Sequence, residues 1–426
     1  MAKVVIIGGG WAGCAAAISA KKAGADVLIL ERTDLLLGLG NVGGIMRNNG
    51  RYTAAEEMIL LGANELFDII DNNYTHKDMD FPGHKHATIY NVTKVEKAVR
   101  DKILSMGIEI RFMSRAVDVE LEDDKIKAII LEDNEKIYAD SFVETTGTSG
   151  PMGVCEAYGN GCSMCILRCP SFGGRVSITR KCGLEDMIGK RNTGEYGAFS
   201  GSMKLLKESL SKEIQDELNE KGCVVVPLPK EFINNEKLDI KVCQQYALPE
   251  FSDNLVLIDT GHVKLMAPFY NLEKLRKIKG FEGAMIVDPY AGGKGNSIRY
   301  AAVSKRDNYM RAKGIKNLFV GGEKSGFYVG HTEAICTGTL AGNNAARLAG
   351  NLNLIQLPTN LLIGDFLNYS NSEFEKEDGN KKKFTFAGSV YFERMKELGL
   401  YTTDKNEIYK RVEKSGLLGM FDKKII

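Results

Sequence analysis

The chain has 426 residues, of which 44% are hydrophobic and 26% charged, the composition of a globular protein with room for more than one domain. Lys and Arg number 56 and Asp and Glu number 55, so the net charge of +1 excludes a strongly basic protein that wraps a polyanion. No run of about 18 apolar residues occurs and the N-terminus lacks a signal-peptide pattern, so we expect a cytoplasmic protein with no membrane partner.

The N-terminal segment is typical of a βαβ unit. Residues 3–9 are a short β-branched run that ends in glycine, and residues 11–24 are an alanine-rich helix. Residues 26–31 are a second apolar run. The sequence therefore predicts two buried parallel strands joined by a helix.

A G-x-G-x-x-G motif lies at the junction of the first strand and the helix, with Gly8, Gly10 and Gly13 at its three positions. The first glycine permits a tight turn, the second lets a pyrophosphate approach the backbone, and the third lets helix and strand pack closely. The helix N-terminus then offers free N–H groups to the phosphates. Glu31 ends the second strand, where its carboxylate can accept bonds from the adenosine ribose. This combination predicts a dinucleotide site.

Further elements follow in chain order. Residues 38–45 form a second glycine-rich loop, and residues 93–106 are a predicted helix. Residues 108–147 alternate in short β-like segments around two charged turns, which indicates a β-meander that returns to the sheet. Residues 317–322 are a predicted strand that runs into glycines, and residues 330–347 are a predicted helix of small residues.

This order of elements resembles the glutathione-reductase-like FAD-binding domain of the large FAD-dependent oxidoreductase superfamily. The resemblance implies an α/β fold in which a Rossmann-like FAD-binding domain with its β-meander spans residues 1–150 and 315–350. A second, mixed α+β substrate domain would span residues 151–314, and residues 351–426 would be a C-terminal helical extension. Ala116 would contact the adenine, Gly322 and Glu323 the ribityl chain and flavin, and the helix that starts near Gly330 would point at the flavin.

We expect the following residues to contact FAD: Gly8, Gly10, Trp11, Ala12, Gly13, Glu31, Arg32, Asn41, Gly43, Gly44, Ala116, Thr146, Gly147, Gly322, Glu323, Gly330, Thr332 and Glu333. His331 begins the helix that would face the flavin, and we predict it as the acid–base catalyst.

Two stretches are similar to tRNA-modifying flavoproteins. Residues 317–350 resemble the C-terminal flavin motif of the tRNA uridine carboxymethylaminomethyl-modification enzymes and of the folate-dependent tRNA uracil-5 methyltransferases, and residues 41–45 resemble the early glycine loop of the former. The chain departs from both families. The methyltransferases have a cysteine in the early loop, whereas this chain has none between Cys14 and Cys155. The carboxymethylaminomethyl-modification enzymes have a C-terminal helical domain that binds tRNA, whereas only a short stretch follows Leu348 here. With a net charge near zero, we expect nucleic acid to be an unlikely partner and keep RNA modification as an alternative.

Four of the nine cysteines cluster in one segment, at Cys155, Cys162, Cys165 and Cys169. The C-x2-C-x3-CP string resembles part of the bacterial ferredoxin pattern, and small residues around it allow the loop to curl. We therefore predict a [4Fe-4S] cluster on these four thiolates, with Cys182 as the alternative fourth ligand. The alternative hypotheses are a zinc site, a redox disulfide between Cys162 and Cys165, and a run of buried free thiols.

No second G-x-G-x-x-G follows a strand, so electrons would come from docked NAD(P)H, a ferredoxin-like partner or the substrate itself. The sequence therefore predicts a FAD-dependent oxidoreductase that relays electrons between the cluster, the flavin and a small organic substrate. The alternatives are a flavin-dependent RNA uridine-modifying enzyme and an electron-transfer subunit of a larger complex. The oligomeric state is left open.

Two local structures complete the predictions. Residues 202–222 contain an apolar stripe at helical spacing, which predicts an amphipathic helix that packs on the core. The motif formed by His84, Lys85 and His86 has the residue types of a metal site, but we expect it to lie in an exposed polar loop.

Overall fold

A computed structural model describes residues 2–148, 169–199, 202–235, 238, 241, 244–267, 270–287 and 298–426. Its central element is a parallel sheet of five strands in the order β19-β10-β1-β2-β6. The strands are β1 (Lys3–Ile7), β2 (Asp26–Leu30), β6 (Glu109–Arg111), β10 (Ser141–Glu144) and β19 (Leu318–Val320). The α/β, Rossmann-like fold predicted from the sequence is confirmed.

Alternate residues of the strands face two different layers. Val4 and Ile6 pack in one apolar cluster with residues of α1 (Trp11–Ala23), α5 (Val95–Ser105) and α13 (His331–Ala349). Val5 and Ile7 pack in a second cluster with the meander, which consists of β7 (Ala116–Glu122), β8 (Lys125–Leu131) and β9 (Lys136–Tyr138). Both faces of the sheet are therefore covered, which explains why its strands read as continuous apolar runs.

The small residues of α13 serve its approach to α1. A Cβ on Gly338 would lie 2.1 Å from the carbonyl oxygen of Ala12, and a Cβ on Gly342 would lie 2.1 Å from that of Ala16. The backbones of the two helices therefore approach too closely for any side chain at these glycines. The two helices therefore run parallel, with the N-terminal end of α1 against the middle of α13.

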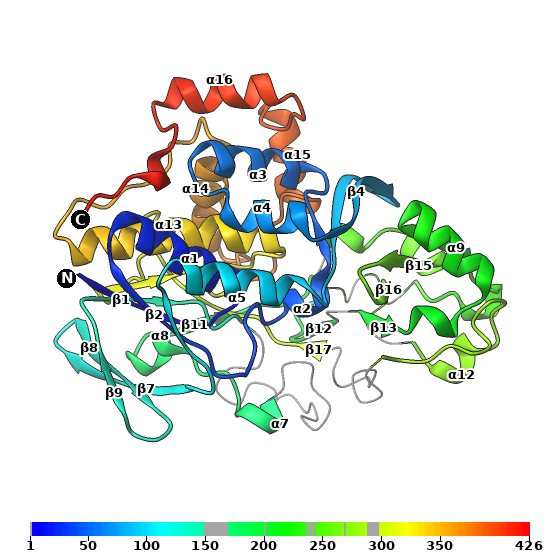
Figure 1. Ribbon diagram of the computed structural model, residues 1–426, viewed down its shortest axis with the longest axis horizontal. Helices are drawn as coiled ribbons and strands as arrows, with labels where there is room; N and C mark the ends of the chain where they lie inside the picture. The colour runs from blue at the N-terminus through cyan, green and yellow to red at the C-terminus, as the bar shows by residue number, and fades with distance from the viewer. Residues whose placement is uncertain are drawn as a thin grey trace.

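A second lobe, at the right of Figure 1, is an antiparallel sheet in the order β13-β16-β15-β14 with α9 (Lys212–Lys221) beside it. Its strands are β13 (Met203–Leu205), β14 (Cys223–Pro227), β15 (Asn254–Asp259) and β16 (Val263–Leu265).

The helix predicted over residues 202–222 is correct only for its second half. The first half is β13, which pairs with β16 and buries Met203 and Leu205 on alternate positions. The Ser211 hydroxyl accepts a bond from the Ile214 N–H and starts α9 there. The apolar spacing continued across a strand and a cap, so the periodicity joined two elements into one.

The C-terminal helices α14 (Leu362–Phe374), α15 (Ser389–Glu397) and α16 (Lys405–Ser415) cover α3 (Gly50–Leu60) at the top of Figure 1. Glu57 of α3 is fully buried and accepts bonds from the Leu362 and Ile363 N–H groups and from Arg411. One carboxylate thus caps α14 and holds α16. Among the described residues, no helix has the length and apolar character needed to cross a membrane.

Candidate functional site

The predicted glycine motifs meet at the carboxyl ends of the parallel strands. From β1, the sheet is extended by β2 and β6 on one side and by β10 and β19 on the other. The order of the strands therefore reverses between β1 and β10, which makes this position a topological switch point. Ligands of open α/β sheets bind at such a switch point. Gly8 follows β1 with a φ of +101°, and a Cβ on it would lie 2.7 Å from the carbonyl oxygen of Thr145, which follows β10. The two turns therefore lie in direct contact.

The second and third glycines of the motif have opposite surroundings. A Cβ on Gly13 would lie 1.9 Å from the carbonyl oxygen of Gly8, so this position holds helix and turn together. A Cβ on Gly10 would meet no described atom within 4 Å apart from its chain neighbours, and Gly10, the N-cap of α1, has no side chain of its own to cap the helix. The space in front of the N-terminus of α1 therefore suits a pyrophosphate.

Glu31 is buried beside this turn, with 7% of its surface exposed. Its Oε2 accepts a bond from the Gly9 N–H at 2.7 Å, and its Oε1 accepts bonds from the Thr33 N–H at 2.8 Å and the Thr33 hydroxyl at 2.9 Å. Glu31 thus orients the glycine turn, while its Oε2, which accepts one bond, keeps capacity for a further donor such as a ribose hydroxyl.

Two other predicted contacts lie nearby on this side of the sheet. Arg32 donates to the carbonyl oxygen of Gly173 at 2.6 Å, and Ala116 is buried where β7 pairs with Leu131 of β8.

The early glycine loop forms the short helix α2 (Gly40–Gly43), whose last carbonyl groups bind two lysines from the second lobe. Lys204 Nζ donates to the Asn41 carbonyl oxygen at 2.6 Å, and Lys264 Nζ donates to those of Val42 and Gly43 at 2.8 and 2.5 Å. The lysines face each other across β13 and β16. The sequence offered no signal for this contact, since neither lysine lies in a recognisable motif.

The His331 ring lies against the same loop. A Cβ on Gly43 would lie 1.8 Å from the His331 Cε1, so only glycine fits there. The ring centroids of Trp11 and Tyr90 lie 6.1 and 6.0 Å from that of His331. Residues predicted from three separate motifs therefore meet at this point.

The N-terminus of α13 has one buried group without a hydrogen-bond partner. The Thr332 hydroxyl is fully buried and finds no partner among the residues that the structure describes. The N-cap of α13 is Gly330, which has no side chain of its own to cap the helix. With the open space at Gly10, this orphaned hydroxyl is the second sign that the helix ends face a bound group.

Four other predicted contacts have side chains or backbone groups engaged within the protein. The Gly322 N–H donates to Thr337 Oγ1, Thr148 donates to Glu323, and the Thr146 hydroxyl donates to Glu144. A Cβ on Gly147 would lie 2.3 Å from an Arg175 nitrogen. These residues shape the turns at the strand ends, so any contact they make with a cofactor would use the remaining backbone groups.

The Glu333 carboxylate lies beside Gly330 at the N-terminus of α13 and is bound by groups of the protein itself. Its carboxylate is fully buried and pairs with Arg51 Nε at 3.1 Å, and it also accepts bonds from the Thr385 hydroxyl and the Phe386 N–H. Arg51 in turn donates to the Asn48 side-chain oxygen at 3.0 Å. We therefore expect Glu333 to support the site through this network rather than to touch a cofactor with its side chain.

The side-chain nitrogen of Asn48 lies 2.9 Å from Nδ1 of His84, a residue that was predicted to lie in an exposed loop. That prediction is wrong, because His84 begins strand β5 (His84–Tyr90), is 2% exposed and stacks on Phe81 with ring centroids 4.6 Å apart. Burial, reinforced by the charge of Arg51, lowers the pKa of His84 from 6.5 to about 3. The three residues are polar, and their neighbours in the sequence do not indicate that His84 begins a strand.

This burial predicts a pH dependence of stability. Below pH 6.5 the unfolded chain binds a proton at His84 and the folded chain does not, so the free energy of unfolding should fall by up to about 1.4 kcal/mol per pH unit between roughly pH 6 and pH 3. Urea unfolding at pH 7 and pH 5 measures this. His84→Gln should reduce the loss and His86→Gln should not, whereas equal losses in both variants would contradict the assignment.

A second buried charge cluster lies beneath the turn after β10. Lys324 is fully buried, and its Nζ lies 2.7 Å from Asp186 Oδ1 and 4.0 Å from Glu144 Oε1. Burial raises the pKa of Glu144, and Lys324 opposes that rise. The cluster joins β10 to the segment after Gly322, so it holds the turns of the candidate site in place.

The predicted cluster ligands Cys155, Cys162 and Cys165 lie outside the described residues. Cys169 begins the short helix α7 (Cys169–Phe172). Cys182 is buried in the apolar cluster under the meander, and burial raises the pKa of its thiol to about 12. In the part of the chain that the structure describes, no three potential ligands come together.

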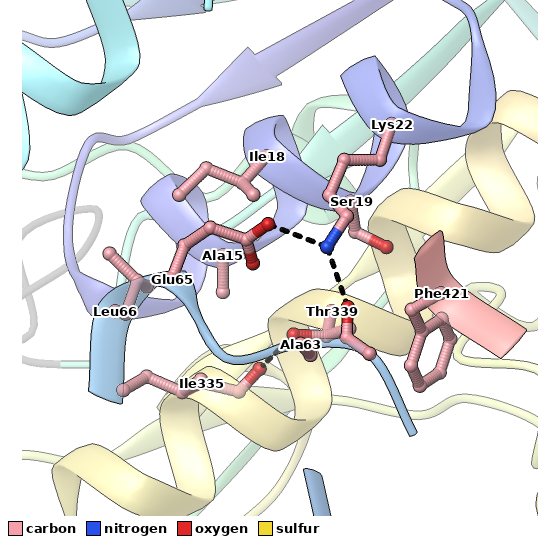
Figure 2. A pocket seen from close by; sticks show the side chains of 11 residues that line it. Ala15, Ile18, Ser19, Lys22, Ala63, Glu65, Leu66, Ile335, Thr339 and Phe421 are labelled. Carbon is pink, nitrogen blue, oxygen red and sulfur yellow. Dashed lines mark hydrogen bonds and ion pairs between the residues drawn. The ribbon is translucent and has the colours of Figure 1, made fainter. Parts of the chain in front are cut away.

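A surface crevice on the flank of α1 and α13 is separate from this site. Its lining includes Ser19 and Lys22 of α1 and Thr339 of α13, all away from the helix N-termini. Figure 2 shows Lys22 crossing it to reach Glu65, with Nζ and Oε1 2.5 Å apart. The crevice is therefore bridged by an ion pair and is not a candidate for the cofactor.

Comparison with known proteins identifies the family to which the chain belongs. The model of the family described as "Glucose inhibited division protein A", GIDA, matches residues 3–256 and 261–353. The chain belongs to the GIDA family. The match includes the glycine turns, the meander, the second lobe and α13, so it covers every segment that forms the site.

Individual proteins match over different extents. Two proteins of Prochlorococcus marinus, strains NATL2A and NATL1A, named methylenetetrahydrofolate–tRNA-(uracil-5-)-methyltransferase TrmFO, are 38% and 40% identical over 96 residues. That stretch is 22% of this chain and about a fifth of each relative. The solved structure of Aquifex aeolicus GidA in crystal form II has a TM-score of 0.63 at 16% identity, covering 97% of this chain and 76% of that one. Form I gives the same TM-score at 14% identity.

These matches support FAD as the cofactor and an enzymatic function, and they correct one expectation. The prediction that nucleic acid is an unlikely partner is contradicted, because the matching relatives are named for a reaction on tRNA. The prediction rested on the net charge, which averages over the whole chain, whereas binding of nucleic acid depends on the local distribution of charge. The matches also give no support to the predicted iron–sulfur cluster.

Proposed function

We propose that this chain is a FAD-dependent enzyme that modifies a uridine base of tRNA. The observation that carries this proposal is the GIDA match, which spans all segments that meet at the switch point. The matched relatives named for methyl transfer to tRNA uracil support the substrate class. RNA uridine modification, the alternative hypothesis from the sequence, thus replaces an oxidoreductase acting on a small organic molecule as the main hypothesis.

The residues of the switch point suit FAD and divide its parts between them. The N-terminus of α1 at Gly10 would hold the pyrophosphate, Glu31 the adenosine ribose, and the end of α13 at Thr332 the flavin. FAD supplies electron-transfer chemistry that amino-acid side chains lack. We assign residues 1–150 and 315–350 to the FAD-binding domain, 151–314 to the substrate domain and 351–426 to the C-terminal extension.

The protein's own part in the reaction centres on the second lobe and His331. Lys204 and Lys264 fix the α2 loop and thereby bring β13 and β16 to the edge of the FAD-binding domain. The His331 imidazole lies against this loop, and we propose it as the group that accepts or donates a proton.

Nucleoside mass spectrometry of total tRNA tests the proposal. Deleting the gene should remove one modified uridine, which a plasmid copy of the wild-type gene should restore. A Gly10→Val copy, which we expect to lose FAD, should not restore it. An unchanged set of modified nucleosides after deletion would overturn the proposal and return attention to small organic substrates.

The cysteine segment supports a second candidate, in which a [4Fe-4S] cluster passes electrons to the flavin. Its basis is the spacing of Cys155, Cys162, Cys165 and Cys169 alone. Under this candidate the Cys165→Ser protein, purified without oxygen, should lose its iron and sulfide and keep its FAD. Cys223→Ser, on strand β14, is the matched control and should keep both. Wild-type protein without iron, or with zinc, would contradict the cluster.

A further inference from the structure

His331 makes a hydrogen bond that determines where its own proton lies. Its Nδ1 is 3.1 Å from the hydroxyl oxygen of Tyr90, the last residue of β5. The same hydroxyl lies 2.6 Å from the carbonyl oxygen of Gly40 in the glycine loop. Tyr90 thus connects the loop to the first residue of α13.

The protons in this chain of contacts can be counted. A carbonyl oxygen only accepts, so the single phenol proton of Tyr90 must point at Gly40. Burial raises the pKa of Tyr90 far above its ordinary value, so the phenol keeps this proton. The Tyr90 oxygen can then only accept from His331, which requires the proton of the neutral imidazole to sit on Nδ1.

We propose that Tyr90 is a positioning residue that holds neutral His331 in the Nδ1–H tautomer, with the lone pair on Nε2. The role of that lone pair as the proton acceptor rests on the proposed function, but the tautomer itself does not. Gly43 supports the arrangement, because its lack of a side chain lets the ring edge lie against the loop.

The buried histidine His84 has the opposite arrangement. The side-chain nitrogens of Asn48 and Asn49 lie 2.9 and 3.3 Å from Nδ1 of His84. The Asn48 orientation is determined by Arg51, which only donates and lies 3.0 Å from its oxygen. His84 Nδ1 therefore accepts, and its Nε2–H donates to the Gln245 carbonyl oxygen at 2.9 Å. The protein would thus contain two histidines with opposite tautomers, His84 buried and His331 partly buried.

Nitrogen-15 NMR of the full-length, histidine-labelled protein at pH 8 tests the proposal without substrate. The chain has only five histidines, and the spectrum of His331→Asn identifies the His331 signals by their loss. In the wild type, His331 should show a protonated-type shift at Nδ1 and a lone-pair-type shift at Nε2, with the reverse for His84. An Nε2–H tautomer at His331 in the wild type would overturn the proposal.

Tyr90→Phe tests the cause of the tautomer. The variant keeps the ring that packs edge-on against Trp11 and removes only the hydroxyl, so His331 should shift towards the Nε2–H tautomer while His84 is unchanged. Tyr52→Phe is the control, because Tyr52 packs on His86 and should leave His331 unaffected. An unchanged His331 in a folded Tyr90→Phe protein would overturn the proposal, and the wild-type spectrum decides it if that variant does not fold. A failed tRNA assay with the expected tautomer would reject only the proposed function.

Discussion

Replacing Gly10 with valine should abolish FAD binding and leave the fold intact. Gly10 has φ −67° and ψ −178°, an extended conformation that valine adopts without strain. Its Cβ would meet no described atom within 4 Å, so the side chain would fill the space that we assign to the pyrophosphate. We expect FAD affinity to fall by about 100-fold or more, equivalent to about 3 kcal/mol.

Two measurements separate binding from folding in this variant. Titration of the apoprotein with FAD gives the affinity, and urea unfolding of the apoprotein should stay within about 0.5 kcal/mol of the wild type. Gly13→Ala is the contrasting variant, because its Cβ would lie 1.9 Å from the Gly8 carbonyl oxygen and should destabilise the fold by about 3 kcal/mol. Wild-type FAD affinity in Gly10→Val would show that the pyrophosphate lies elsewhere.

Lys324→Met should be the most destabilising charge removal in the candidate site. The lysine and its partners Glu144 and Asp186 are almost completely buried, so the variant leaves two carboxylates without a cation. Loss of one partner from a buried ion pair costs about 3–5 kcal/mol of unfolding free energy. Lys316→Met is the matched control, because its pair with Asp124 is exposed and should be worth at most about 1 kcal/mol.

The pH dependence of the Lys324→Met deficit tests its electrostatic cause. Burial already raises the pKa of Glu144, and loss of Lys324 removes a charge that holds it down. The buried carboxyls of the variant should therefore take up protons at a higher pH than those of the wild type. The stability difference should shrink between pH 7 and pH 5 in urea unfolding, whereas a constant difference would indicate lost packing alone.

The second lobe changes how the site is understood. A dinucleotide motif by itself predicts a cofactor, whereas the substrate must come from what faces it. Here Lys204 and Lys264 bring β13 and β16 against the loop that packs on His331. Variants of these lysines should therefore affect loop position and substrate entry, a consequence that the glycine motifs alone do not suggest.

The sequence by itself determined the features that depend on neighbouring residues. The G-x-G-x-x-G turn, the strands around it, the meander and the glycine-rich α13 were predicted because each needs particular residue types at short spacing. Gly13 and Gly338 illustrate this, since backbone contact at those positions admits no side chain.

Only the tertiary structure decided which distant residues meet. Arg51 pairs with Glu333, Lys264 binds the Gly43 carbonyl group and Tyr90 binds His331, in each case across more than two hundred residues. Such contacts leave no periodicity in the chain, because they depend on how elements far apart in the sequence pack together. For the same reason His84 was taken for a surface residue, and its burial followed only from the pairing of β5 with its neighbours.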